Sequence, residues 1–96
     1  MTNELDGLYR QYASNFSALA VKKYNGENIE GQLEKLLNEA LDHFKLITSI
    51  PFDESADKFL GKVKMLAQSK DGAQKERREL AAEAIIFVNN YVQKNS

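Results

Sequence analysis

The sequence predicts an all-α fold, a four-helix antiparallel bundle whose successive helices run up, down, up and down. Three observations predict it. Apolar residues recur at spacings of three and four along four segments, and only one proline and five glycines occur in 96 residues. The connections between the segments are short, so each helix must turn back on the one before it. A chain of this length builds one hydrophobic core, and residues 1–96 are therefore expected to form a single domain.

The first helix is predicted over residues 4–24. Its apolar stripe consists of Leu5, Leu8, Tyr9, Tyr12, Phe16, Leu19 and Ala20. The Thr2 side chain is expected to cap the first turn. Asn25 with Gly26 is expected to adopt the left-handed conformation that ends the helix.

The second helix is predicted to start at Asn28, a favourable N-cap residue. It is expected to end near Ser49, because Pro51 disfavours helical geometry at Ile50. Its apolar stripe consists of Ile29, Leu33, Leu36, Leu37, Ala40, Leu41, Phe44 and Ile47.

A shorter third helix is predicted, capped by Asp53 or Ser55 and closed by Asp71 with Gly72. Its buried stripe consists of Ala56, Phe59, Leu60, Val63, Leu66 and Ala67. Asp71 stands three residues before Gln74, which is the spacing of a capping box that opens the fourth helix.

The fourth helix is expected to continue to the C-terminus. Its stripe consists of Leu80, Ala81, Ala84, Ile85, Phe87, Val88, Tyr91 and Val92. Residues 85–88 favour a strand by composition. Residues 79–84 are mostly strong helix formers, however, and a lone strand would have no partner, so a helix is the favoured interpretation.

When residues are placed at steps of about 100° around each predicted helix, some apolar residues lie outside the apolar stripe. They are Val21, Leu46, Met65 and Ile86. Single exposed apolar residues are common on soluble proteins. If Ile86 lies beside another exposed apolar residue on a neighbouring helix, the two would form a small anchor patch for a partner protein or for a second copy of the chain. Ile86 and Met65 are therefore candidate contact residues, and a homodimer is one possible use of them.

Charge is unevenly distributed along a chain whose formal net charge is −1. Residues 1–57 hold ten acidic and five basic residues, whereas residues 58–96 hold eight basic and four acidic ones. The simplest consequence is a weak attraction between the acidic second helix and the basic third helix.

The turn before the fourth helix carries a basic cluster. Its members are Lys70, Lys75, Arg77 and Arg78. Cations in the first turns of a helix oppose its dipole, by about 0.3 to 1 kcal/mol each, unless a negative group lies near. Either Glu76 and Glu79 neutralise the cluster, or it binds an acidic protein surface, a phosphate or a lipid headgroup. Specific duplex DNA is not an expected partner, because the whole chain is not basic and carries no helix-turn-helix or RNA-binding signature.

The residue types argue against an enzyme. The absence of cysteine excludes thiolate metal sites, disulfides and a cysteine nucleophile. Di-metal four-helix proteins place a Glu-x-x-His pair on two helices, whereas here the only histidine, His43, follows Glu39 by four residues. No catalytic residue, metal or cofactor is therefore expected. Histidine phosphotransfer at His43 is the alternative, but the residues that follow do not match the His-x-x-Lys-Gly pattern, and a histidine that packs and hydrogen-bonds is favoured.

The function expected from these observations is non-catalytic binding of another protein, as an inhibitor, immunity protein, chaperone or regulator. In size and helix count the chain resembles the cytosolic immunity proteins that protect bacteriocin producers. No motif residue carries this resemblance, and the chain lacks the basic charge that is common in those proteins. The sequence shows neither a signal-like start nor a transmembrane segment, so a cytoplasmic location is expected.

Overall fold

The computed structural model describes residues 4–47, 50–69 and 72–95, and all regular elements in these ranges are helices. The helices are α1 (Glu4–Tyr24), α2 (Gln32–Ile47), α3 (Phe52–Ala67) and α4 (Gln74–Asn95). The predicted all-α four-helix bundle is confirmed, including the helical state of residues 85–88. Thr2 and Asp71, two of the expected capping residues, lie outside the described ranges. Within the described ranges, no helix has the length and apolar character needed to cross a lipid bilayer.

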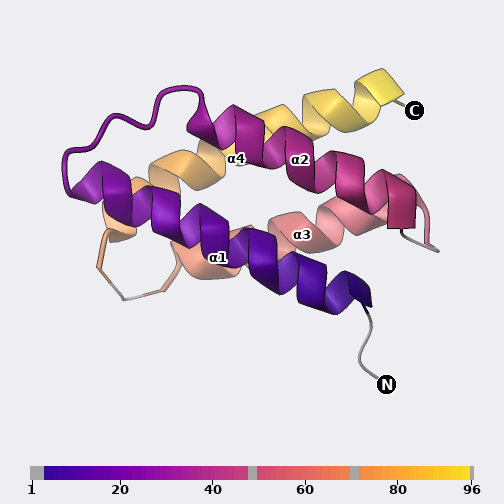
Figure 1. Ribbon diagram of the computed structural model, residues 1–96, viewed down its shortest axis with the longest axis horizontal. Coiled ribbons are helices and arrows are strands. Elements are labelled where there is room, and N and C mark those ends of the chain that lie inside the picture. Colours follow the sequence, from indigo (N-terminus) through magenta and orange to yellow (C-terminus); the bar gives the residue numbers. More distant parts are fainter. Residues whose placement is uncertain (1–3, 48–49, 70–71, 96) are drawn as a thin grey trace.

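The helices form two layers, with α1 and α2 in front of α3 and α4 (Figure 1). The closest packing joins α3 to α4, whereas α2 and α3 contact each other least. The electrostatic attraction expected between the acidic α2 and the basic α3 is therefore limited, because few of their residues lie close together. The up-down-up-down order stays a prediction, and the colours in Figure 1 progress in opposite directions along α1 and α2, as that order requires.

The core is centred on Phe44, whose side chain is fully buried. Its ring makes edge-to-face contacts with the rings of Tyr9, Phe59 and Tyr12, at centroid distances of 5.0, 5.4 and 6.0 Å. Such contacts add to the free energy gained from apolar burial. Because the three partner rings come from α1 and α3, Phe44 of α2 holds three helices together.

The end of α1 follows the prediction. Gly26 has a φ of 85°, in the left-handed region that glycine adopts without strain. The backbone N–H of Gly26 donates to the carbonyl oxygen of Lys23, and that of Glu27 donates to the carbonyl oxygen of Lys22, both at 3.0 Å. This pair of bonds is the Schellman arrangement that satisfies the last carbonyl groups of a helix.

The start of α2 differs from the prediction, because the helix begins at Gln32 rather than after an N-cap at Asn28. The Asn28 Oδ1 atom accepts a hydrogen bond from the backbone N–H of Glu30 at 3.0 Å, which forms a local turn instead. Gly31 then has a φ of 81°, which a right-handed helix cannot contain. The predicted N-cap is therefore wrong, and residues 27–31 form a connection beside α2.

The start of α3 also differs. Pro51 precedes the first turn with φ −53° and ψ 141°, and no side chain caps this end of the helix. Ser55 is fully buried inside α3, where its backbone carbonyl accepts a hydrogen bond from the Tyr9 hydroxyl at 3.1 Å. Asp53 Oδ1 accepts from the N–H of Glu54 at 3.0 Å. Neither residue is therefore the N-cap. As expected, α3 is shorter than α1 and α4, but it is not shorter than α2, since α2 and α3 each contain 16 residues.

Between α3 and α4 the left-handed residue is Ala73, with a φ of 66°, rather than Gly72. Ala73 is buried, and its carbonyl oxygen accepts the hydrogen bond of the Arg77 N–H at 2.9 Å. Because α4 begins at Gln74, this residue is the first of the helix and not the third position of a capping box, so that prediction is wrong. Packing of the Ala73 methyl group in the core offsets the cost of this conformation for a residue with a Cβ atom.

Candidate functional site

The four members of the predicted basic cluster do not form one surface. Lys75 and Arg78 are exposed, and Lys70 lies outside the described residues. Arg77 is only 6% exposed, and its Nη2 atom donates a hydrogen bond to Ser17 Oγ of α1 at 3.1 Å. The expectation that Arg77 is a surface contact is therefore wrong, because its side chain joins α4 to α1.

Of the two acidic residues expected to neutralise the basic cluster, Glu79 has its main partner outside the cluster, although the charge of Lys75 also contributes to lowering its pKa. Glu79 forms an ion pair with Lys23 of α1, with Nζ and Oε2 2.6 Å apart. This hydrogen bond is the main cause that raises the pKa of Lys23 and lowers the pKa of Glu79. Both side chains are partly exposed, so the pair contributes little to stability but defines one end of the space between α1 and α4.

The two apolar candidates are exposed, as predicted. Ile86 of α4 is 64% exposed and Met65 of α3 is 73% exposed. The structure does not bring them together in one recess. Ile86 borders a groove between α2 and α4, called the α2–α4 groove below, whereas Met65 does not line it.

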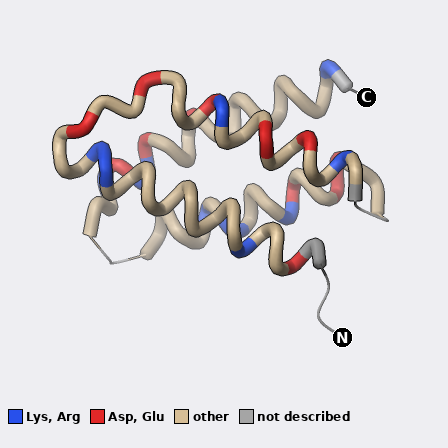
Figure 2. Tube along the Cα trace, viewed as in Figure 1, with Lys and Arg blue, Asp and Glu red and all other residues tan. Residues whose placement is uncertain are grey.

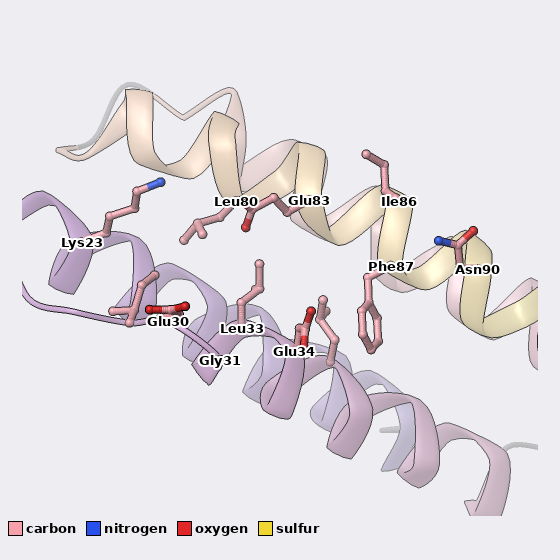
Figure 3. Close-up of a pocket in the computed structure, with 12 residues that line it drawn as sticks. Lys23, Glu30, Gly31, Leu33, Glu34, Leu80, Glu83, Ile86, Phe87 and Asn90 are labelled. Carbon is pink, nitrogen blue, oxygen red and sulfur yellow. The ribbon is translucent and has the colours of Figure 1, made fainter.

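The α2–α4 groove has a volume of about 690 Å³ and opens to solvent (Figure 3). Its apolar residues are Ile29, Leu33, Leu37, Leu80, Ile86 and Phe87. Phe87 points from α4 toward α2, whereas Ile86 lies on the outer edge and points away from α2 (Figure 3). Ile29 and Phe87 are half-buried, and Leu37 and Leu80 are buried beneath them. The condition set for an apolar anchor at Ile86, a second exposed apolar residue on a neighbouring helix, is not met, because the other apolar residues of the groove are half-buried or buried.

Acidic side chains border the α2–α4 groove. Glu30 and Glu34 lie on the α2 side and Glu83 on the α4 side, and all three are exposed. Within the described residues, none of these carboxylates takes part in an ion pair. Figure 2 shows that acidic positions recur along the connection before α2 and along α2 itself. The groove thus combines an apolar floor with an acidic border.

A second recess, of about 560 Å³, continues the α2–α4 groove toward the C-terminal end of α4. The two spaces share Phe87 and Asn90, and the second ends at Tyr91 and Lys94. The ring of Tyr91 stacks on that of Phe87 at a centroid distance of 6.3 Å. The α2–α4 groove and the second recess together form one elongated surface along α4.

Near the C-terminal end of α4, Tyr91 contacts two residues of α2. It donates a hydrogen bond to Asp42 Oδ1 of α2, and Lys45 Nζ lies 5.3 Å from the centre of the Tyr91 ring. The hydrogen bond to Asp42, followed by burial and the charge of Asp42, raises the pKa of Tyr91 to about 12. Tyr91 therefore connects α4 to α2 with its proton retained at neutral pH.

A groove between α1 and α2 has different chemistry. Its volume is about 510 Å³, and its charged residues are Lys22, Lys35 and Glu39. Its largest apolar residues, Leu19 and Leu36, are buried in the core. This groove offers no exposed large apolar side chain and no surface of a single charge.

His43 is exposed on α2, and its Nδ1 atom shares a hydrogen bond with the buried hydroxyl of Tyr12. Burial, followed by the charge of Glu39, raises the pKa of Tyr12. The position of His43 agrees with a histidine that packs and hydrogen-bonds at the edge of the core. Across the part of the chain that is described, no three His, Asp or Glu side chains gather in a way that would hold a metal ion.

Sequence reasoning assigned two groove residues, Ile29 and Phe87, to the core. Ile29 is half-buried in a connection that does not continue α2, and Phe87 is half-buried on α4. The signal for this was the pair Gly26 and Gly31, which bracket the connection and both have positive φ. The groove lies where this connection passes α4.

Comparisons of the chain with protein-family models, with curated proteins and with solved structures give no significant match.

Proposed function

We propose that the chain is a non-catalytic binding protein that holds a segment of another protein in the α2–α4 groove. The presence of Phe87 and Ile29 in one open recess, with the exposed Ile86 on its outer edge, carries this proposal. Apolar side chains at the centre of a groove supply most of the energy of protein interfaces, whereas scattered exposed residues do not. Each role expected from the sequence, as inhibitor, immunity protein, chaperone or regulator, begins with such a binding step.

The experiment compares Ile86→Asp with Leu46→Asp. Both changes place a carboxylate on an exposed apolar position, but Leu46 of α2 is 81% exposed and does not line the groove. A protein captured from the native lysate is identified, purified and titrated against each variant by calorimetry. We expect Leu46→Asp to bind like the unaltered chain and Ile86→Asp to bind about tenfold more weakly or worse.

A double variant of the two exposed residues of the basic cluster tests the alternative, that the partner binds at the turn before α4. If Lys75→Glu with Arg78→Glu removes binding while Ile86→Asp retains it, the partner contacts the turn before α4 through an acidic surface, and the groove proposal is rejected. Arg77 is left unchanged in this variant, because its burial would make the result a test of folding.

Histidine phosphotransfer is the second candidate function. The observation in its favour is that His43 is exposed and that its ring is oriented by Tyr12. The nearby carboxylate of Glu39 opposes a phosphoryl group, which needs cationic neighbours. Incubation with acetyl phosphate tests this candidate: label on the unaltered chain that is lost in a folded His43→Gln variant would support it, and an unlabelled chain would reject it.

A further inference from the structure

We infer that the occupant of the α2–α4 groove is a basic amphipathic helix of a partner protein. This inference rests on the proposed function and specifies the partner. Three properties of the groove lead to it: the chemistry of its walls, the sign of its border charges and its length.

The walls of the groove favour a helix over an extended strand. Apart from one end, which is lined by Lys23 of α1 and by residues 29–31 of the connection, the walls are formed by α2 and α4, whose backbone groups are bonded within each helix. An extended peptide would find no free sheet edge here, since the described residues contain no strand. A helix satisfies its own backbone hydrogen bonds and can direct one apolar face at the half-buried Phe87 and Ile29, with Ile86 at the edge of the contact.

The border charges favour a basic occupant. Glu30, Glu34 and Glu83 flank the apolar floor from both sides, and no cation among the described residues pairs with them. Lys23, the cation that lines the groove, forms its ion pair with Glu79, and its charge also interacts with that of Glu83. Lysine or arginine residues on both flanks of an apolar stripe would meet these carboxylates, whereas an acidic helix would be repelled.

The length of the surface sets the length of the occupant. From Leu80 to Asn90 the groove follows eleven residues of α4, and the ten steps between them span about 15 Å at 1.5 Å per residue. The second recess extends it to Lys94. The matching segment is therefore a helix of about three to four turns, with apolar residues at spacings of three and four.

Two synthetic peptides test the inference directly. Both are about four turns long and carry leucine at the same helical positions, but one has lysine and the other glutamate on the flanks of the stripe. Binding is measured by calorimetry, and the site is located by NMR amide shifts. We expect the lysine peptide to bind with shifts at Leu33, Ile86 and Phe87, and to bind about tenfold more tightly than the glutamate peptide at low salt. This preference should diminish at high salt.

Variants of the chain provide the matched control. Glu34→Lys with Glu83→Lys reverses two border charges and should weaken binding of the lysine peptide by about tenfold. Glu39→Lys is the control, because Glu39 lies on α2 like Glu34 but lines the groove between α1 and α2. The affinity of this variant for the lysine peptide should stay within about twofold of that of the unaltered chain. Circular dichroism confirms that each variant is folded.

Three results would overturn the inference. One is equal binding of the two peptides, or binding of neither. Another is an equal effect of the Glu39→Lys change and the double reversal. The third is amide shifts in the groove that depend only on the concentration of the chain, which would identify a second copy as the occupant. The proposed function has its own criterion, because it fails only when Ile86→Asp still binds the native partner.

Discussion

The side chain of Arg77 lies in the interior between α4 and α1, where its charge requires polar partners. Its Nη2 atom donates to Ser17 Oγ, and its aliphatic part is enclosed with the rest of the side chain. A buried arginine of this kind contributes through packing as well as through its hydrogen bonds. Two neighbouring arginines in the sequence thus have different roles, because Arg78 remains in solvent.

Arg77→Ala is predicted to lower the free energy of unfolding by about 2 to 4 kcal/mol, because it removes a buried side chain and its hydrogen bond. Arg78→Ala is the control. It removes the same charge from an exposed position and should change stability by less than about 0.5 kcal/mol. Urea denaturation of the two variants measures the difference, and equal midpoints would show that Arg77 is not held in the interior.

The hydroxyl of Tyr91 makes stability depend on alkaline pH. Its pKa is raised to about 12 from 10.0, first of all by the hydrogen bond to Asp42. Because the folded protein holds this proton more tightly than the unfolded chain, the stabilisation is complete below pH 10 and is lost as the pH rises toward 12. We therefore expect the urea midpoint of the unaltered chain to fall more between pH 9 and pH 11.5 than that of Tyr91→Phe. Parallel curves for the two proteins would contradict this.

At the scale of elements, the two glycines at positions 31 and 61 are in opposite situations. Gly31 has a φ of 81° in the connection before α2, whereas Gly61 lies inside α3, and a Cβ atom would meet no neighbour at either position. Any effect of alanine at these positions therefore reports on the backbone alone.

Gly31→Ala is predicted to destabilise the protein by about 1 to 2 kcal/mol, because an L-residue adopts the left-handed conformation at a cost. Gly61→Ala is predicted to stabilise it by about 0.5 to 1 kcal/mol, because alanine is the better residue within a helix. Thermal and urea denaturation give the signs. Stabilisation by both changes would indicate that α2 starts at Asn28 after all, and that the groove is narrower than described.

At the scale of the molecule, stability depends on the aromatic centre that joins α1, α2 and α3. A domain of this size has a free energy of unfolding of about 5 to 15 kcal/mol. Phe44→Ala is predicted to remove about 3 to 5 kcal/mol of it, because the ring is fully buried and contacts three others. Leu46→Ala, two residues further along α2 and 81% exposed, should change it by less than about 0.5 kcal/mol.

The contrast between these two positions was predictable from periodicity. Phe44 belongs to the apolar stripe of its helix and Leu46 does not, and the bundle buries the one and exposes the other. The same pattern located Ile86 and Met65 on the surface. Hydrophobic periodicity reports the direction in which each side chain points from its own helix.

The sequence by itself determined the helical class, the number of helices, most of the buried stripes and the exposed position of Ile86. These properties are set within each helix, where side-chain spacing and backbone geometry act locally. Only the tertiary structure decided that Arg77 is buried, that Glu79 pairs with Lys23, and that Phe87 faces a groove. Those outcomes depend on which helix lies opposite, and a local pattern contains no information on the neighbour. The groove itself arises because residues 27–31 follow the left-handed geometry of Gly31 rather than the periodicity of α2.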